Sequence, residues 1–104
     1  MASNPRLSVI IVNWNVCELL RDCLESVYAE MQLPPEEFEV IVVDNASSDG
    51  SVDMLRECFP EVRLLASEEN LGFAGGCEEG YKVCSGVYVL LLNPDTVVKD
   101  HAID

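Results

Sequence analysis

Positive charge is scarce in this sequence. It has 6 Lys and Arg residues against 19 Asp and Glu residues, which gives a formal net charge of −13. Six cationic side chains are too few for a basic patch, so nucleic-acid binding through phosphates is excluded and an anionic membrane surface is disfavoured. Apolar residues still make up 49% of the chain. The acidity therefore indicates a charged surface around a core, not disorder.

Long hydrophobic runs are also missing. The longest, Val87–Leu92, has six residues, whereas a transmembrane helix needs roughly 20. The first six residues, Met1–Arg6, contain no apolar segment of the kind found in signal peptides. We therefore expect a cytoplasmic protein, with any membrane association supplied by parts of the protein outside these 104 residues.

Cysteine is present, but not in a metal-binding or disulfide pattern. The five cysteines are odd in number, and no two of them form a Cys-x-x-Cys pair. In the absence of a secretion signal we expect reduced thiols, most of them buried as small apolar side chains. The only histidine, His101, has no second ligand at a suitable spacing and is expected at the surface.

Four short apolar runs rich in Val, Ile and Leu predict the strands. They are mostly apolar and show no clean alternation with polar residues, which is typical of strands buried on both faces of a parallel sheet. The runs are Leu7–Val12, Phe38–Val43, Val62–Ala66 and Val87–Leu92.

Apolar residues recur with helical spacing between these strands. The first helix is predicted from Val16 to about Gln32, before Pro34 and Pro35, and a shorter second helix is capped by Ser48 or Asp49 and ends at Pro60. The third is marked by Phe73, Cys77, Tyr81 and Cys84. The alternation predicts one α/β domain over residues 1–104, with a mostly parallel four-stranded sheet and helices on both faces.

Polar residues follow every predicted strand. Open α/β sheets bind ligands beyond the carboxyl ends of their strands, so these residues are expected to meet at one rim. They are Asn13–Asn15, Asp44–Asp49, Ser67–Gly72 and Asn93–Thr96.

Taken singly, each of these rim residues has a plain structural interpretation beside a functional one. The Asp44 carboxylate can accept a hydrogen bond from a ring N–H of a pyrimidine base, or it can stabilise a turn. Trp14 suits stacking on a base or sugar, or covering the core. The Gly-rich entry to a helix at Asn70–Gly76 suits a phosphate, or tight helix packing, and it lacks the P-loop and dinucleotide patterns. Asp95 suits Mg²⁺ or Mn²⁺, or the end of a strand.

Together and in this order, the segments resemble the N-terminal, nucleotide-binding half of a family 2 glycosyltransferase with the GT-A fold, a Rossmann-like three-layer α/β/α arrangement. The resemblance runs from Leu7 to about Lys99. Its matching stretches are Leu7–Asn15, Val42–Ser51, Glu69–Gly76 and Leu91–Thr96. The form Asn93-Pro94-Asp95 is similar to the rhamnosyltransferase-like branch, in which it replaces the metal-binding Asp-x-Asp.

The resemblance implies a UDP-sugar or dTDP-sugar donor, Mg²⁺ or Mn²⁺, and inverting sugar transfer to a hydroxyl of a saccharide, lipid-linked or other acceptor. Asp95 would be the metal ligand and Asp44 would bind the base. The base and ribose pocket would be lined by Asn13–Asn15, and the loop at residues 70–76 would approach the diphosphate and sugar. The implied nucleotide-sugar-binding residues are Asn13, Trp14, Asn15, Asp44, Asn70, Gly72, Gly75, Gly76 and Asn93.

The sequence departs from the family pattern in two ways. The family usually continues Gly-Gly-Asn-Asn where this chain has Cys77 and Glu78 after the glycines, and Glu78 adds negative charge beside the expected diphosphate. The half that carries the acceptor site and the general base is expected beyond Asp104, so no catalytic base is expected here. We expect such a fragment to transfer no sugar alone, and its open sheet edge to allow a homodimer.

Other classes fit less well. A receiver-like or flavodoxin-like module would need an acidic cluster or a Ser/Thr-rich loop after the first strand, and a nucleotidyltransferase a Gly-rich loop with Arg or Lys. The residues there, Asn13–Val16, match none of these. A degenerate GT-A-like module with a structural or interaction role remains the main alternative, and metal-dependent nucleotide binding distinguishes it from the leading interpretation.

Overall fold

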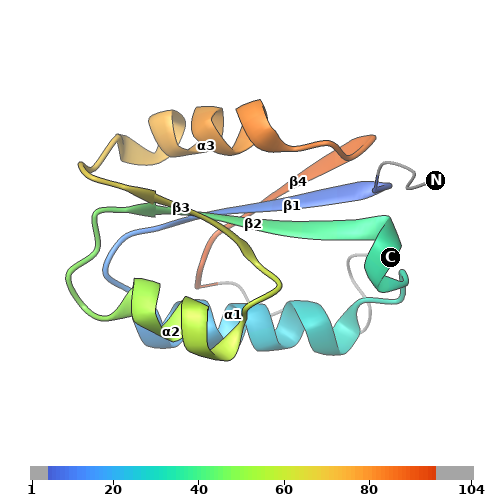
Figure 1. Cartoon of the computed structure of the whole chain (residues 1–104), viewed down its shortest axis with the longest axis horizontal. Coiled ribbons are helices and arrows are strands. Elements are labelled where there is room, and N and C mark those ends of the chain that lie inside the picture. Colours follow the sequence, from blue (N-terminus) through green and yellow to red (C-terminus); the bar gives the residue numbers. More distant parts are fainter. Residues whose placement is uncertain (1–4, 96–104) are drawn as a thin grey trace.

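The computed structural model describes residues 5–95, which form three layers with a parallel sheet in the middle (Figure 1). The elements follow the predicted order, with one added 3₁₀ turn (η1). They are β1 (Leu7–Asn13), α1 (Cys17–Glu30), η1 (Pro35–Glu37), β2 (Phe38–Asn45), α2 (Ser51–Cys58), β3 (Arg63–Ser67), α3 (Gly72–Val83) and β4 (Tyr88–Leu92).

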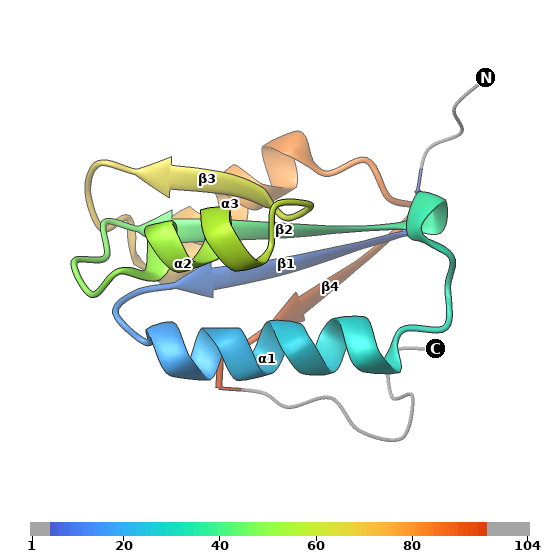
Figure 2. The same cartoon turned by 60° about the horizontal axis from the view of Figure 1, so that its bottom comes forward.

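The four strands are all parallel and lie in the order β3-β2-β1-β4. Helices α1 and α2 lie side by side on one face, and α3 covers the other (Figures 1 and 2). The predicted α/β class, the parallel sheet and the helices on both faces are therefore confirmed. In this order β1 and β2 are the inner strands, and β3 and β4 form the edges.

Burial differs between inner and edge strands. β1 and β2 are buried along most of their length, as their continuous apolar runs predict. The apolar runs of β3 and β4 also predicted burial on both faces, but each has only partly buried and exposed residues. The prediction is wrong for the edges, because within residues 5–95 each edge strand has a neighbouring strand on one side only.

The two faces of the sheet carry cores of different size. The larger core joins β1 and β2 to α1 and α2, and its fully buried side chains include Leu20, Leu24 and Leu55. On the α3 face the buried cluster is small and consists of Ile10, Ile41 and Val43. A thinner core on that face means that α3 lies close to the sheet.

Glycine explains the close approach of α3. A Cβ atom on Gly76 would lie 2.6 and 3.0 Å from the two methyl groups of Val12 on β1. The helix predicted from Phe73, Cys77, Tyr81 and Cys84 is present, but Phe73 and Tyr81 are both 58% exposed. The buried positions of α3 are instead glycines, so the apolar stripe that marked the helix is not its packing face.

Three further expectations are corrected by the structure. α1 ends at Glu30, because Met31 is already extended, and the N-cap of α2 is Gly50 with φ of 89°. Only Cys23 is fully buried among the cysteines. Cys58 is exposed and the others are partly buried, so most of them do not serve as core residues. All five are free thiols, as predicted.

Candidate functional site

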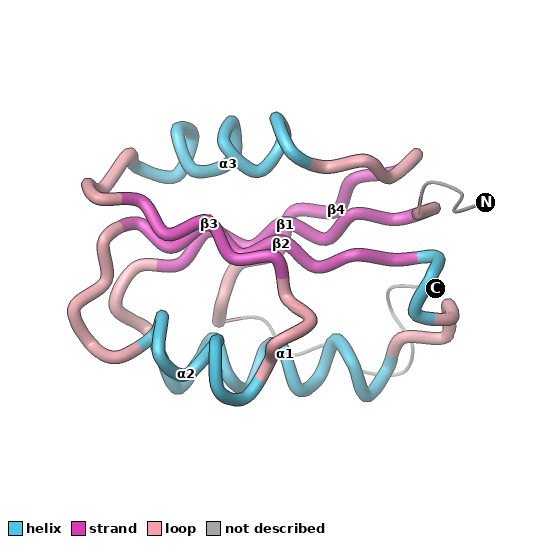
Figure 3. The backbone as a smooth tube through the Cα atoms, in the orientation of Figure 1, coloured by secondary structure: helices cyan, strands magenta, loops and turns pink. Residues whose placement is uncertain are grey.

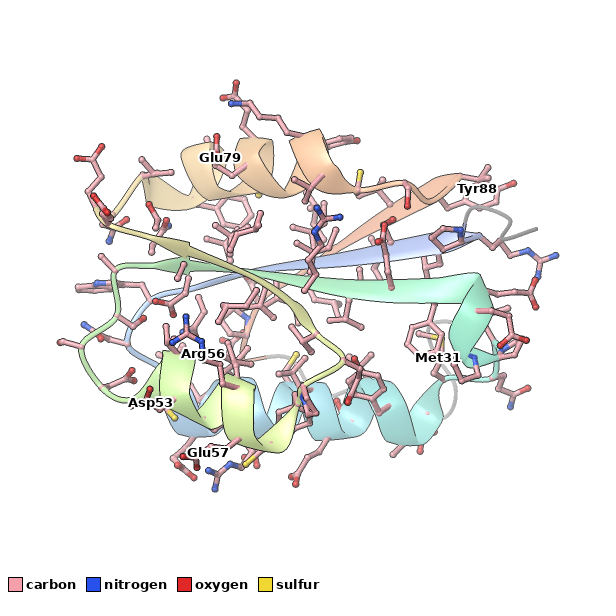
Figure 4. The ribbon with its side chains drawn as sticks, viewed as in Figure 1. Met31, Asp53, Arg56, Glu57, Glu79 and Tyr88 are labelled. Atoms are coloured by element: carbon pink, nitrogen blue, oxygen red, sulfur yellow. The ribbon has the colours of Figure 1, made fainter. Side chains whose placement is uncertain are left out.

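The carboxyl ends of the strands bring three connecting loops to one rim of the molecule (Figure 3). These loops follow β1, β2 and β3, and β4 ends at the same rim with Asn93, Pro94 and Asp95. Figure 4 shows Tyr88 at the opposite end of the sheet, where β4 begins. All predicted site residues lie among the described residues. His101 and the last part of the resemblance, Thr96–Lys99, lie outside them.

Asp44 lies at the centre of a hydrogen-bonded group at the ends of β1 and β2. Its Oδ1 accepts from the Nδ2 of Asn13 at 2.9 Å, and its Oδ2 accepts from the backbone N–H of Ser47 at 2.9 Å. Asp44 is only 1% exposed. The carboxylate is therefore closed off from solvent among its own hydrogen-bond partners. Each oxygen keeps a second lone pair for a further N–H donor.

Asn13 is fully buried beside Asp44 and is only partly satisfied. Its Nδ2 has acceptors on Asp44 and Ser47, but its Oδ1 has no hydrogen-bond partner. A buried acceptor without a donor is unfavourable by roughly 1–3 kcal/mol. The pair therefore offers acceptor atoms to any N–H or O–H group that enters this part of the rim.

The loops after β1 and β2 are joined by further hydrogen bonds. The backbone N–H of Asn15 donates to the hydroxyl of Ser47 at 2.9 Å, and the Oδ1 of Asn15 accepts from the backbone N–H of Ser48 at 2.8 Å. Asn15 has a φ of 52° and Ala46 a φ of 61°. Asparagine adopts this left-handed conformation more readily than other residues with a Cβ atom, whereas for alanine it is uncommon.

Asp49 ties the starts of α1 and α2 together. One carboxylate oxygen accepts from the backbone N–H of Cys17 at 2.9 Å, and the other accepts from both the hydroxyl and the backbone N–H of Ser51. Burial acts to raise the pKa of Asp49, but these hydrogen bonds to its charged form outweigh that effect and lower the pKa.

Asn45, the last residue of β2, holds the loop between β3 and α3. Its Nδ2 donates to the carbonyl of Gly72 at 3.0 Å, and its Oδ1 accepts from the backbone N–H of Leu71 at 3.4 Å. Within the loop, the Oδ1 of Asn70 accepts from the backbone N–H of Gly72 at 2.8 Å, and Gly72 has a φ of 76°. The start of α3 is thereby fixed next to the end of β2.

The glycines predicted to approach a donor lie in different surroundings. Gly72 is exposed at the start of α3, whereas Gly76 is buried against Val12 and lies beside the Nδ2 of Asn45. A Cβ atom on Gly75 would meet the side chain of Leu71 at 2.8 Å. Close packing already accounts for glycine at Gly75 and Gly76.

Trp14 and Asp95 line a common hollow of about 380 Å³ at the rim. We call it the Trp14–Asp95 hollow, and it is lined by Val12, Trp14, Val16, Leu19, Asn93, Pro94 and Asp95. Trp14 is 54% exposed, so it does not cover the core. The hollow thus pairs an aromatic face with a carboxylate.

Helix α1 supports the turn that carries Asp95. The Sγ of Cys23 lies 3.7 Å from the carbonyl oxygen of Asn93. Burial, together with the nearby charge of Asp95, raises the pKa of the Cys23 thiol to about 11. Cys23 is therefore a neutral, inert thiol at physiological pH.

The residues present can hold a divalent cation only in part. No cluster of three or more His, Cys, Asp or Glu side chains suited to a metal occurs within residues 5–95. Asp95 is a single exposed carboxylate. Mg²⁺ is commonly held by one or two carboxylates, with water and substrate phosphates completing its shell. This donor set therefore fits a metal that arrives with a phosphate ligand.

The structure brings the predicted residues together in three groups. Asp44 binds Asn13, Trp14 shares a hollow with Asp95, and Asn70 and Gly72 begin α3. Asp44 lies near the carboxyl end of β2 and Asp95 lies three residues beyond the end of β4, with β1 between the two strands. Sequence reasoning missed the roles of Asn45 and Ser47, although both lie in the polar segment after the second strand.

Solved structures with the same fold define the class of protein. A mannosyltransferase from Pyrobaculum calidifontis, solved with GDP-Man and Mn²⁺, matches 95% of this chain with a TM-score of 0.84 and 28% identity. TarS from S. aureus, solved with UDP-GlcNAc, matches 94% with a TM-score of 0.81 and 27% identity. The matched parts are 30% and 29% of those chains. The fold is that of the GT-A glycosyltransferases.

Sequence comparison then identifies the family. The profile of glycosyl transferase family 2 matches residues 8–104, and the chain belongs to that family. It is 33% identical to the uncharacterized glycosyltransferase YibD of Escherichia coli over 94% of its length, and 28% identical to a poly(ribitol-phosphate) beta-glucosyltransferase of Bacillus spizizenii, also over 94%. The chain spans 28% and 16% of these relatives.

Proposed function

We propose that this chain is the donor-binding part of an inverting glycosyltransferase that uses a nucleoside-diphosphate sugar and a divalent cation. The Trp14–Asp95 hollow carries the proposal, because an aromatic side chain and a hard oxygen ligand line the same space. Two solved relatives, bound to GDP-Man with Mn²⁺ and to UDP-GlcNAc, support this class of ligand.

The strand order suggests how the donor would lie. The base would lie at the ends of β2 and β1, near Asp44, Asn13 and Asn15, with Trp14 beside the base or ribose. The diphosphate would lie at the end of β4, where Asp95 would hold the metal and Asn93 would assist. Neighbouring strands are about 4.8 Å apart, so the donor would extend across two strand spacings.

The loop at Asn70–Gly76 would form the remaining wall. The first turn of α3 contains no acidic residue, and the Asn70 side chain accepts only from the N–H of Gly72, so the N–H groups that follow Gly72 suit an anionic or polar group of the donor. Asn45 ties this loop to β2, which favours contact near the base end as well as with the diphosphate and sugar. Glu78 lies on the exposed surface of α3, beyond that first turn.

A bound cation would neutralise charge that develops on the departing nucleoside diphosphate. This function matters especially in a chain of net charge −13, which would otherwise repel the donor. The acceptor, a hydroxyl of a saccharide, lipid-linked or other molecule, and the carboxylate that deprotonates it would belong to a further part of the protein. On this view the 104-residue chain binds the donor but transfers no sugar.

Three finer assignments are part of the same proposal. UDP-sugar and dTDP-sugar are the favoured donors, and the Asn93-Pro94-Asp95 turn favours the rhamnosyltransferase-like branch. A cytoplasmic location is the third. No helix within residues 5–95 is long and apolar enough to cross a membrane.

Self-association through the open edge at β4 is a separate proposal, favoured by the exposed Leu91.

Calorimetric titration of UDP and dTDP, with and without Mn²⁺, tests the donor site. We expect Mn²⁺ to strengthen nucleotide binding at least about tenfold, and Asp95→Asn to abolish that gain. Because Asp95 is one carboxylate, Mn²⁺ without nucleotide should bind weakly. Asp53→Asn removes the same charge from an exposed position on α2 (Figure 4) and should leave the gain intact.

Asp44→Ala should weaken nucleotide binding whether or not Mn²⁺ is present, because its role is at the base end. Binding of neither nucleotide at millimolar concentration, in a chain shown by circular dichroism to be folded, would contradict the proposal. The degenerate, non-catalytic GT-A-like module would then be the better description of this chain.

A further inference from the structure

The residues on either side of Trp14 are anchored by hydrogen bonds to the loop after β2. Asn13 donates its Nδ2 to the Ser47 hydroxyl at 3.4 Å and to Asp44 at 2.9 Å. Asn15 donates its backbone N–H to the same hydroxyl at 2.9 Å. Trp14 itself is 54% exposed. Burial therefore fixes its side chain only in part, and the backbone that carries it lies between two anchored neighbours.

Ser47 is the junction of this arrangement. Its hydroxyl accepts from both neighbours of Trp14, and its backbone N–H donates to Asp44. One residue of the β2–α2 loop thus connects the backbone around Trp14 with the buried carboxylate at the end of β2. The left-handed conformations of Asn15 and Ala46, which are adjacent to these contacts, are the kind that need such support.

We infer that Ser47 is a positioning residue, whose hydroxyl presets the Trp14 ring at the edge of the Trp14–Asp95 hollow for stacking on the base or ribose of a nucleoside diphosphate. An aromatic ring held in its binding orientation loses less conformational freedom when a ligand stacks on it. The geometry stands on the hydrogen bonds above, whereas the identity of the ligand rests on the proposed function.

Trp14 is the only tryptophan in the chain, so its fluorescence reports on this position alone. We compare Ser47→Ala with Ser48→Ala, a matched control because Ser48 is exposed and contributes its backbone N–H to the loop contacts. Ser47→Ala should lower the fluorescence anisotropy of Trp14 in the free protein. It should also raise the Kd for UDP with Mn²⁺ about tenfold.

Two conservative variants separate positioning from general destabilisation. Ser47→Thr keeps the hydroxyl and should restore both the anisotropy and the Kd. Ser47→Cys has a similar shape but a weak sulfur acceptor, so it should behave like Ser47→Ala and serves in its place if the alanine variant does not fold. Thermal unfolding followed by circular dichroism verifies that each variant is compared well below its midpoint.

The outcomes distinguish this inference from the proposed function. If the unsubstituted chain binds no nucleotide, the proposed function fails, and the anisotropy of the free variants still tests whether Ser47 holds Trp14. If Ser47→Ala or Ser47→Cys matches Ser48→Ala within twofold in Kd and leaves the anisotropy unchanged, the positioning role is overturned. A loss of nucleotide binding that Ser47→Thr does not restore also overturns it.

Discussion

Asp49 shows how one carboxylate at the residue scale supports a whole rim. It accepts hydrogen bonds at the start of α1 from Cys17 and at the start of α2 from Ser51. A negative charge at a helix N-terminus is favourable both as a hydrogen-bond acceptor and through the helix dipole. The loop after β1, which carries Trp14, leads into α1, and the loop after β2, which carries Ser47, leads into α2. Asp49 therefore also holds these two loops next to each other.

We predict that Asp49→Asn lowers the free energy of unfolding by about 1 kcal/mol at pH 7, because an amide has one acceptor oxygen where the carboxylate has two, so one of the two helix starts loses its hydrogen-bond partner. The folded-state pKa of Asp49 lies below its ordinary value near 3.8, so its charged form stabilises the fold above that value. This stabilisation is lost as the pH falls through the lower, folded-state pKa. Urea unfolding of both proteins at pH 7 and near pH 3 measures the difference.

The same experiment includes a control for net charge. Asp53→Asn removes an exposed carboxylate from the first turn of α2 without removing a bridge to α1. It should have the smaller effect at pH 7. A difference between Asp49→Asn and the original chain that is unchanged from pH 7 to pH 3 would show that the charge of Asp49 is not what stabilises the fold.

Asp44 and Asn13 illustrate the limit of prediction for single residues. Their positions at the ends of two apolar runs were predicted as rim positions, and the structure places them there. Their hydrogen bond joins residues 31 positions apart, so no local sequence pattern predicts it. Ser47 and Asn45 were visible only as polar residues in a turn-forming segment, and their roles depend on partners brought by other strands.

At the scale of elements, the contact between α3 and β1 decides the position of the α3 start. A Cβ atom on Gly76 would meet both methyl groups of Val12, so rotation of the valine side chain cannot make room for it. The glycines allow α3 to lie flat on the inner strands. They leave Phe73 and Tyr81 exposed, which is the reverse of what an amphipathic pattern predicts.

We predict that Gly76→Ala destabilises the fold by about 1–2 kcal/mol, because overpacking outweighs the better helix propensity of alanine. Adding Val12→Ala should recover part of this loss, since the second substitution removes both methyl groups in contact. A double-mutant cycle from urea unfolding measures the coupling between the two sites. Additive effects of the two substitutions would contradict the steric explanation.

At the scale of the whole molecule, the two sheet edges differ in protection. β3 carries the exposed Arg63, and two glutamates, Glu68 and Glu69, follow it. Residues 85–94, which include β4, carry no charged side chain in a molecule of net charge −13. Exposed edge strands are commonly protected by charge, and an uncharged one pairs readily with another strand.

We predict that this 104-residue chain self-associates through β4, more strongly at high salt because screening weakens repulsion between the acidic molecules. Leu91→Lys, which places a charge on the open edge, should shift the chain to monomer in sedimentation velocity experiments. Ala66→Lys places the same charge on β3 and should not. A monomer at all salt concentrations, or equal effects of both substitutions, would exclude the β4 interface.

Considered alone, the sequence determined the kinds of element, their order and the α/β class, because helical and extended segments impose local apolar spacings of their own. It also determined the charge, and it placed a polar residue at the end of each strand. The tertiary structure decided the strand order β3-β2-β1-β4, the burial of Asp44, the glycine face of α3 and the pairing of Trp14 with Asp95 in one hollow. These features depend on contacts between residues far apart in the chain, which arise only when the crossover connections set the strands side by side.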